Sequence, residues 1–204
     1  MADRVRIGII GSSWFADLCH LPNLKSHPQA VLAAICSRGR ERAEEMARKY
    51  GIPAVYTDYR EMIQKAGLDA VAVVTPDDTH YAMTTEALEA GLHVLCEKPL
   101  APTAAEAKAM YEKAEAAGVK HMTFFTNRWH PHYRYLHELV EQGYVGRCFH
   151  AHILYMAGFS RGATAHAWRY DRRRANGVLG DLGSHMIDLA RWLVGDITQV
   201  SAGS

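Results

Sequence analysis

Apolar and polar positions alternate along the first 125 residues in two recurring patterns. Short, mostly apolar runs bounded by glycine or proline occur at residues 5–10, 31–36, 70–74, 94–96 and 119–125. Runs of this length and composition are typical of strands that are buried on both faces of a parallel sheet. We therefore expect five buried strands in this part of the chain.

Segments with the spacing of amphipathic helices lie between these runs, at residues 40–50, 79–90 and 103–117. Each is followed by a glycine, where a helix commonly ends in a left-handed residue: Gly51, Gly91 and Gly118. Thr103 followed by Glu106 predicts a capping box at the start of the third helix. The alternation predicts right-handed βαβ units and an α/β fold with a Rossmann-type, doubly wound parallel sheet.

The pattern changes after residue 125. Helical spacing returns at residues 132–142 and 181–194, and a strand-like alternation covers residues 147–156. A further strand is expected to start within residues 197–202, and the arginine-rich stretch 158–177 has the composition of a loop. The chain thus predicts two domains.

The predicted domains are a complete dinucleotide-binding domain over residues 1–125 and the beginning of a substrate domain over residues 126–204. The second is a partial α+β domain, because its one or two strands make a sheet too small to be stable by itself. We expect the chain to be truncated, or this surface to be covered by partner chains or by the first domain.

Composition excludes several classes of function. The 204 residues carry a formal net charge of +1. This is not the excess of positive charge that is typical of proteins that bind nucleic acid or anionic membranes. No apolar run approaches the ~20 residues that a membrane-spanning helix needs, and the first residues do not resemble a signal peptide. The four cysteines are widely spaced and form no CxxC pair, which indicates reduced thiols in a cytoplasmic protein.

Two histidine pairs raise the question of a metal site. His130 and His132 flank a proline, and His150 and His152 would face the same way on a strand. No cluster of acids or cysteines completes a ligand set at a recognisable spacing. We therefore expect polar surface or interface histidines, and no metal.

A glycine turn follows the first apolar run and opens a helix, as in a dinucleotide-binding fingerprint. In the stretch Gly11-Ser-Ser13-Trp14-Phe15-Ala16, Ser13 and Ala16 occupy the second and third glycine places. The helix N-terminus would offer N–H groups to a pyrophosphate, and the Ser13 hydroxyl a further donor. The alternative interpretation is an ordinary strand–helix turn.

The end of the second strand bears on the choice of cofactor. An acid there would hold the ribose 2′-hydroxyl of NAD, but the strand ends in Ser37 and Arg38. A guanidinium can bind a 2′-phosphate through two hydrogen bonds, so the sequence allows NAD or NADP and slightly favours NADP. Alternatively, Arg38 is only a solvated charge at a strand end.

Several stretches, in this order and spacing, resemble the Gfo/Idh/MocA family of oxidoreductases over essentially the whole chain. They are the glycine turn, residues 73–80 (VVTPDDTH), residues 97–100 (EKPL), Asn127-Arg128 and residues 180–188 (GDLGSHMID). The resemblance implies hydride transfer between NAD(P) and a carbon that bears a hydroxyl or carbonyl group. It also implies a sugar, cyclitol or related polyol as substrate, and a homo-oligomer.

Three residues are expected to carry the chemistry. Lys98 follows a strand at the edge where open α/β sheets bind ligands, and Asp181 and His185 are spaced for one helical face. The near-neutral pKa of histidine suits a general base, and a carboxylate can orient its ring. The resemblance implies that Lys98 polarises the reacting oxygen and contacts the cofactor, that His185 is the base, and that Asp181 is its partner; all three contact substrate.

Each of these three residues also has a simpler interpretation. Lys98 can be a surface lysine beside a turn proline, and Asp181 an acid in the first turn of a helix. His185 can be a core or surface histidine.

The resemblance assigns further residues to binding. Cofactor contacts are implied for Thr75, Pro76, His80, Glu97 and Asn127, and substrate contacts for Arg128 and for Arg169, which follows Trp168. Asp188 has a structural interpretation instead, in which it pairs with Arg191 or caps a neighbouring loop.

Two alternatives to a dehydrogenase remain open. Some members of the family use a tightly held cofactor for redox-neutral epimerisation or glycoside cleavage. A chain that lacks much of the C-terminal domain can also be a cofactor-binding module without turnover.

Overall fold

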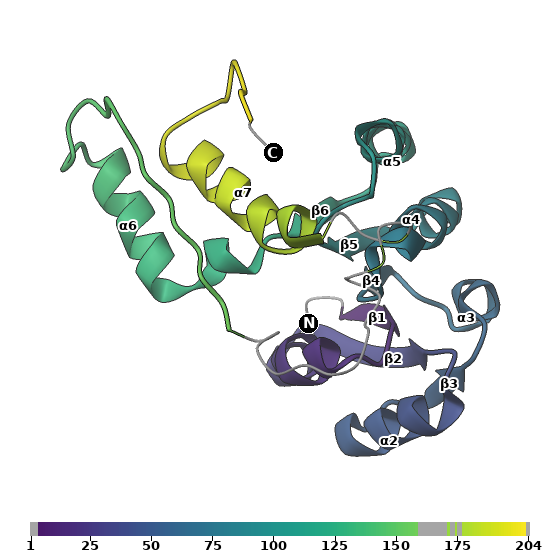
Figure 1. Cartoon of the computed structure of the whole chain (residues 1–204). Helices are drawn as coiled ribbons and strands as arrows, with labels where there is room; N and C mark the ends of the chain where they lie inside the picture. The colour runs from purple at the N-terminus through teal and green to yellow at the C-terminus, as the bar shows by residue number, and fades with distance from the viewer. Residues whose placement is uncertain (1–3, 159–170, 172–173, 175–176, 203–204) are drawn as a thin grey trace. The chain divides into compact units, whose positions relative to one another are not determined.

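The computed structural model describes residues 4–158, 171, 174 and 177–202, which form two compact units (Figure 1). The first unit is Met1–Phe124 and the second is Phe125–Ser204.

Six parallel strands form the sheet of the first unit, in the spatial order β3-β2-β1-β4-β5-β6. They are β1 (Val5–Ile10), β2 (Ala30–Cys36), β3 (Ala54–Tyr56), β4 (Ala70–Val73), β5 (His93–Glu97) and β6 (His121–Phe124). The five expected strands and the doubly wound, Rossmann-type parallel sheet are confirmed. Only β3 was not expected, because three residues are too few for a recognisable apolar run.

Helices connect successive strands and cover both faces of this sheet (Figure 1). The helical elements are η1 (Ala16–His20), α1 (Leu21–Ser26), α2 (Arg40–Tyr50), α3 (Tyr59–Lys65), η2 (Asp77–Thr79), α4 (His80–Glu89) and α5 (Ala104–Ala117). Of these, η1 is a π-helical turn that runs directly into α1. The helices at 40–50, 79–90 and 103–117 are confirmed to within a residue; α3 was not expected.

Two apolar clusters form the core, one on each face of the sheet. Alternate residues of a strand face opposite ways, so Ile9 packs with the first helix and α2, whereas its neighbour Ile10 packs on the side of α3, α4 and α5. Both isoleucines are almost completely buried. Strands with apolar residues on both faces are what a sheet covered on both sides requires.

The helix ends follow the expected pattern of caps. Gly51, Gly91 and Gly118 have φ values of +68°, +73° and +65°, in the left-handed region that glycine enters without a steric penalty. At the start of α5, Thr103 Oγ1 accepts a hydrogen bond from the Glu106 N–H at 3.2 Å and donates to the Glu106 carboxylate at 2.8 Å. The Thr103 side of the predicted capping box is therefore formed, whereas the Glu106 carboxylate bonds the Thr103 hydroxyl and not its backbone N–H.

The regular secondary structure described in the second unit is all helical. Its elements are η3 (Thr126–Trp129), α6 (Pro131–Glu141), η5 (Leu179–Gly183) and α7 (Ser184–Leu193). The two long helices contact each other, and the rings of His137 and Trp192 stack between them at 4.2 Å. The helices expected at 132–142 and 181–194 are confirmed, with a π-helical turn, η5, at the start of the second.

The strands expected in the second unit are wrong for the described residues. Residues 147–156 and 197–202 have neither strand structure nor a backbone ladder there. A strand needs a neighbour for its N–H and C=O groups, and an alternating pattern cannot supply one. The loop expected at 158–177 lies mostly outside the described residues. Among the helices that the structure describes, none is long and apolar enough to cross a membrane.

The cap on α5 gives a test of this description of the fold. Thr103→Ala removes both capping contacts, so the free energy of unfolding is expected to fall by about 1 kcal/mol in urea denaturation. Thr85→Ala is the matched control, because the Thr85 hydroxyl bonds the Tyr81 carbonyl within α4 and caps no helix end. We expect no loss for the control. Equal losses in the two variants would contradict the capping role.

Candidate functional site

Gly11 ends β1 at the point where the strand order reverses. Its N–H donates to the Cys36 carbonyl of β2 at 2.8 Å, and the Val74 N–H donates to the Ile10 carbonyl at 2.8 Å. Gly11 has a φ of +118°, and a Cβ added there would lie 2.1 Å from the Val74 carbonyl oxygen. Only glycine fits both the conformation and the space. Ligands of open α/β sheets bind outside the strands' carboxyl ends at such a reversal.

Ser13 stands immediately before the first helical residue, Trp14. The Ser13 hydroxyl accepts a hydrogen bond from the Ala16 N–H at 3.2 Å, and the Ser13 carbonyl accepts from the Asp17 N–H at 3.2 Å. A hydroxyl that accepts in this way still has its own hydrogen to donate. Ala16 is completely buried against the sheet, Phe15 is partly buried, and the Trp14 side chain is 63% exposed.

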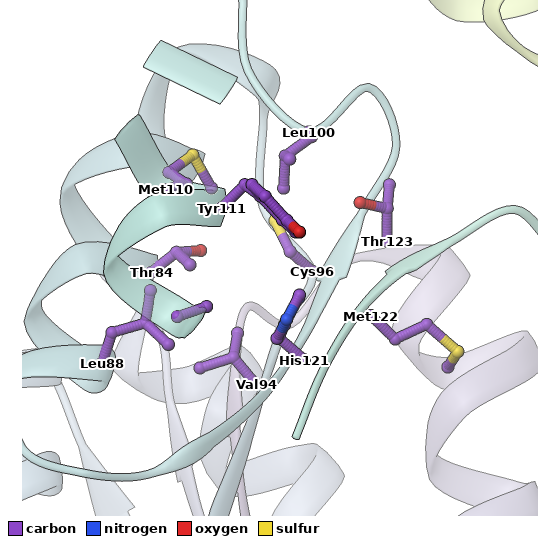
Figure 2. A pocket seen from close by; sticks show the side chains of 11 residues that line it. Thr84, Leu88, Val94, Cys96, Leu100, Met110, Tyr111, His121, Met122 and Thr123 are labelled. Carbon is purple, nitrogen blue, oxygen red and sulfur yellow. The ribbon is translucent and has the colours of Figure 1, made fainter. Parts of the chain in front are cut away.

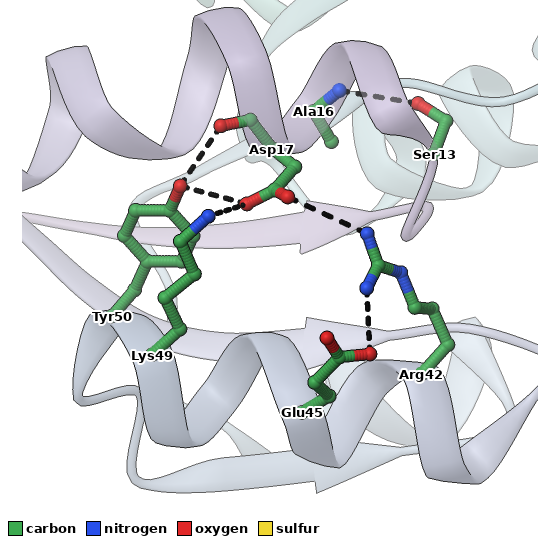
Figure 3. Close-up of polar contacts among 7 residues, drawn as sticks. All are labelled: Ser13, Ala16, Asp17, Arg42, Glu45, Lys49 and Tyr50. Atoms are coloured by element: carbon green, nitrogen blue, oxygen red, sulfur yellow. Dashed lines mark hydrogen bonds and ion pairs between the residues drawn. The ribbon is translucent and has the colours of Figure 1, made fainter.

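Asp17 ties this helix to α2 (Figure 3). Its carboxylate accepts from Lys49 Nζ at 2.7 Å and from the Tyr50 hydroxyl at 2.8 Å, and it lies 3.4 Å from Arg42 Nη2. The hydrogen bond from Lys49, followed by that from Tyr50, lowers the pKa of Asp17 below its ordinary value. The carboxylate therefore stays ionised at neutral pH and fixes the helix that follows the glycine turn.

The end of β2 lies beside the glycine turn. The hydroxyls of Ser12 and Ser37 are hydrogen-bonded at 2.7 Å, and the Ser37 N–H donates to the Tyr56 carbonyl of β3 at 3.1 Å. Arg38 is exposed, and its guanidinium has no ion pair or hydrogen bond with another described residue. No acid stands at this strand end, as the sequence analysis found.

The residues after β4 form a hydrogen-bonded turn. The Thr79 hydroxyl contacts the Thr75 hydroxyl at 2.7 Å and the Pro76 carbonyl at 2.6 Å. The next residue, His80, begins α4 and is completely buried. Its ring nitrogens lie 2.9 Å from the Thr75 carbonyl and 2.9 Å from the Pro99 carbonyl. The loops that follow β4 and β5 are thus joined through one imidazole.

Glu97, the last residue of β5, has a partner that the sequence analysis missed. Its carboxylate lies 2.6 Å from His20 Nε2, and both side chains are nearly buried. The His20 ring also packs on Phe15 and Phe124, with centroids 5.6 and 4.9 Å apart. His20 lies four residues after Ala16, so its spacing alone could have placed it on the sheet-facing side of the helix.

Lys98 follows directly, at the carboxyl edge of the sheet. Its backbone N–H donates to Glu97 Oε2 at 3.2 Å, its side chain is partly buried, and the Lys98–Pro99 peptide bond is cis. The carboxylate of Glu97 is therefore engaged by His20 and by the backbone of Lys98. A contact between Glu97 and the cofactor remains a prediction.

In the second unit, Arg128 and Asp188 form a two-pronged ion pair. Arg128 Nε and Nη2 donate to the two carboxylate oxygens at 2.8 and 2.7 Å. Asp188 is nearly buried, and the guanidinium also lies over the Trp192 ring. The expected pairing of Asp188 with Arg191 is wrong. Arg191 bonds Asp196 instead, because it points to the exposed side of α7 while Asp188 points inward.

The predicted acid and base lie at the start of the last helical segment. Asp181 is in the π-helical turn η5 and is partly buried, and His185 follows in α7 and is buried. The His185 ring packs edge-on against Phe125 at 6.1 Å. Single π-helical turns inside helices often accompany functional sites, and here one such turn ends at His20 and another ends two residues before His185.

Asn127 has an unusual environment. Its side-chain nitrogen is buried and has no hydrogen-bond partner among the described residues. A buried donor without a partner costs about 1–3 kcal/mol, so this position suits a group that meets a ligand. Trp168 and Arg169 lie outside the described residues. Within the described part of the chain, no group of histidines, cysteines and acids could hold a metal ion.

A pocket of about 260 Å³ lies elsewhere in the first unit, between α4, α5, β5 and β6 (Figure 2). Its walls are mainly apolar and include Leu88, Val94 and Met110, with the Cys96 and Thr84 side chains among them. None of the residues predicted to bind cofactor or substrate lines this pocket. It is therefore separate from the predicted site residues.

Comparison with known proteins places these features in a family. Residues 5–125 match the model of the oxidoreductase family with an NAD-binding Rossmann fold, and residues 133–204 match the Gfo/Idh/MocA C-terminal domain. The chain belongs to the Gfo/Idh/MocA family. The resemblance found in the sequence is thereby confirmed.

Relatives in this family include sugar and cyclitol dehydrogenases. Levoglucosan dehydrogenase of Pseudarthrobacter phenanthrenivorans is 34% identical over 174 residues, which are 84% of this chain and 45% of that protein. Myo-inositol 2-dehydrogenase of Thermotoga maritima is 33% identical over 192 residues, 94% of this chain and 55% of that protein. The chain spans about half the length of the curated relatives it matches.

Solved structures agree with the family assignment. A levoglucosan dehydrogenase in complex with NADH and levoglucosan matches with a TM-score of 0.85 and 31% identity, over 95% of this chain and 55% of that chain. An oxidoreductase domain protein from Kribbella flavida matches with a TM-score of 0.86 and 35% identity, over 96% and 55%.

The residues of the glycine turn fit the dinucleotide that this family binds. Gly11 supplies the tight turn, the helix begins two residues after Ser12, and the Ser13 hydroxyl is free to donate its hydrogen toward a phosphate oxygen. Ser13 adds a Cβ where the fingerprint has its second glycine, and this Cβ belongs to the residue that caps the helix. The departure from the fingerprint therefore has a structural role of its own.

The glycine turn yields a stability test. Gly11→Ala places a Cβ against the Val74 carbonyl oxygen, so we expect the free energy of unfolding to fall by about 3 kcal/mol or more in urea denaturation. Gly39→Ala is the matched control, since a Cβ there meets nothing within 4 Å and φ is −86°. A Gly11→Ala protein as stable as the control would contradict the close approach of β1 and β4.

Proposed function

We propose that this chain binds NAD(P) at the glycine turn, and that the protein transfers hydride between the cofactor and a hydroxyl-bearing carbon of a sugar or cyclitol. The observation that supports this most is the placement of Gly11 and Lys98. They follow β1 and β5, which flank β4 in the sheet, at the same carboxyl edge. The substrates named for the relatives are levoglucosan and inositol, both rich in hydroxyl groups.

The proposed chemistry needs two kinds of side chain besides the cofactor. The nicotinamide supplies the hydride acceptor when it is bound. Lys98 is proposed to bind the reacting oxygen with its ammonium group, because a positive charge there stabilises an alkoxide as it develops. His185 is proposed to take the hydroxyl proton as a general base, and Asp181 to orient the ring and stabilise its cation.

The position of Asp188 supports this division of roles. Because its carboxylate is occupied by Arg128, the acid of the second unit proposed to act with His185 is Asp181. Arg128 uses its Nε and Nη2 for Asp188, which leaves Nη1 for the proposed substrate contact. Asn127, with its buried side-chain nitrogen, is proposed to contact the cofactor.

For the adenosine end of the cofactor we propose a preference for NADP. Arg38 stands at the end of β2 without a partner among the described residues, next to the Ser37 hydroxyl. A guanidinium and a hydroxyl together can bind a 2′-phosphate, whereas the 2′-hydroxyl of NAD is usually held by an acid at this place.

We also propose that the protein works in the cytoplasm as a homo-oligomer. The four cysteines are all unpaired thiols, and two of them, Cys36 and Cys96, are buried in the sheet. Free thiols of this kind persist in a reducing compartment.

The catalytic proposal is tested on Lys98. Lys98→Ala is expected to lower turnover with levoglucosan, myo-inositol or a related polyol by about 100-fold or more, because an oriented charge at the reacting oxygen contributes at least that much. The dissociation constant for NADH, from fluorescence titration, should change less than about threefold, since the turn and helix that hold the pyrophosphate are intact.

Lys108→Ala is the control, because Lys108 is an exposed lysine of α5 that pairs with Glu112. Unchanged turnover in Lys98→Ala would reject the proposed role of Lys98. Binding of NADH without turnover of any polyol by the unsubstituted protein would favour the cofactor-binding module instead.

The preference for NADP is tested on Arg38. Arg38→Ala is expected to weaken NADPH binding about tenfold, a loss of about 1.4 kcal/mol, while NADH binding stays the same. Arg40→Ala serves as control, because Arg40 is also exposed but pairs with Glu44 on α2. If Arg38→Ala weakened both cofactors equally, the preference could not arise from a 2′-phosphate contact.

A further inference from the structure

His80 has a hydrogen-bonding arrangement that fixes its protonation state. Nδ1 lies 2.9 Å from the Pro99 carbonyl oxygen, and Nε2 lies 2.9 Å from the Thr75 carbonyl oxygen. A carbonyl oxygen can only accept, so each ring nitrogen has to donate. Neutral imidazole carries one N–H, whereas imidazolium carries two. The geometry therefore calls for the charged ring.

The surroundings of the ring have opposing effects on its charge. Burial is the largest influence and lowers the pKa of His80, but the hydrogen bond and charge interaction with the Cys96 side chain, together with the bonds to Pro99 and Thr75, outweigh it and raise the pKa to about 9. Among the described residues, the titratable side chain that acts on the ring is Cys96 of β5, and the loops after β4 and β5 present carbonyl oxygens. The raised pKa of His80 thus agrees with the two carbonyl contacts, because both favour the protonated ring.

The two carbonyls belong to the loops that flank the proposed site. Thr75 follows β4, and Pro99 directly follows Lys98. On the other side of Lys98, Glu97 is fixed by His20. The backbone of Lys98 is thus held through its preceding residue by one histidine and through its following residue by another.

We infer that His80 is a positioning residue that, as a doubly protonated imidazolium, ties the loop after β4 to the loop after β5 and thereby fixes the place of Lys98. The part of this inference that concerns turnover rests on the proposed function. The protonation state and the effect on Lys98 do not, and each can be measured without a substrate.

The protonation state is tested by nitrogen NMR of the imidazole rings in the unsubstituted 204-residue chain. The His80 signals are assigned by their loss in His80→Gln. We expect both ring nitrogens to carry protons at pH 8, where an ordinary imidazole with a pKa of about 6.5 is neutral. A neutral His80 ring at pH 8, with one protonated nitrogen, would overturn the inference.

The pH dependence of stability gives an independent check. Because the pKa of folded His80 exceeds the value of about 6.5 in the unfolded chain, its charge stabilises the fold fully below pH 6.5, and this stabilisation is lost as pH rises through about 9. The stability advantage of the unsubstituted chain over His80→Gln should shrink across this window. An advantage that stays constant from pH 6.5 to 9 would indicate a neutral, merely structural histidine.

The effect on Lys98 is tested by ¹³C-methylation of the lysines, which gives each amine its own NMR signal. The Lys98 signal, assigned through Lys98→Arg, should move in His80→Gln and stay in place in His93→Gln. His93 is the control because it is an exposed histidine at the start of β5, where its Nδ1 accepts from the Lys120 N–H. An unmoved Lys98 signal in His80→Gln would reject the positioning role.

Turnover completes the test where a substrate has been found. His80→Gln should lower kcat about tenfold or more, because small displacements of a catalytic group are costly, while the dissociation constant for NADH changes less than about threefold. Unchanged kcat in His80→Gln would reject the positioning role. Absence of turnover in the unsubstituted protein would contradict the proposed function, whereas the two NMR experiments would still decide the protonation state of His80 and its effect on Lys98.

Discussion

The close approach of Gly11 to the Val74 carbonyl oxygen determines the geometry of the carboxyl edge of the sheet. The missing side chain lets β1 and β4 stay hydrogen-bonded to their ends, and the chain then turns at once into a helix. With any Cβ at this position, one of the two strands would have to move away. The turn at Gly11 sets the position and direction of the helix that follows. The Ser13 cap and the contacts of Asp17 to α2 depend on that position.

Polar contacts between segments that are distant in sequence then fix the chain within each of the two units. His20 and Glu97 are 77 residues apart, and Arg128 and Asp188 are 60 apart. Buried polar groups are costly without partners, and a pair that loses one member is strongly destabilised. Such contacts therefore favour one arrangement of the loops over alternative arrangements that would bury a similar apolar area but leave these polar groups unpaired. A single loop arrangement matters most next to side chains that must hold a fixed position.

How much could be predicted from the sequence depends on how local each signal is. The strands at 5–10 and 70–74, and Thr103 as the cap of α5, were predicted correctly because each is specified by neighbouring residues. The short strand β3 was missed, since its pairing with β2 rather than its own three residues makes it a strand. The expected strand at 147–156 failed for the converse reason: its alternation is present, but the described residues offer it no partner.

The partners of the candidate site residues were the hardest to predict. Motif order identified Glu97 and His80 as residues of interest, but nothing near them in sequence indicates His20 or the Pro99 carbonyl. Similarly, Asp188 was expected to pair with Arg191, which is close along the helix, or to cap a neighbouring loop, whereas the fold supplies Arg128 from 60 residues away. In the sheet of the first unit, Glu97 and His80 come from separate βαβ units, so their contacts are fixed only once the order of the strands is fixed.

This arrangement also explains why histidine is found at both positions that hold the Lys98 segment. In the proposed function the Lys98 ammonium group binds the reacting oxygen, and the backbone of Lys98 is held through the residues on either side. Glu97 offers a carboxylate to His20, and Pro99 has no N–H and offers only a carbonyl to His80. Imidazole is small enough to be buried, and in its protonated form it carries an N–H on each side of the ring. An amide in place of His80 would present its oxygen to one of the two carbonyls that His80 joins.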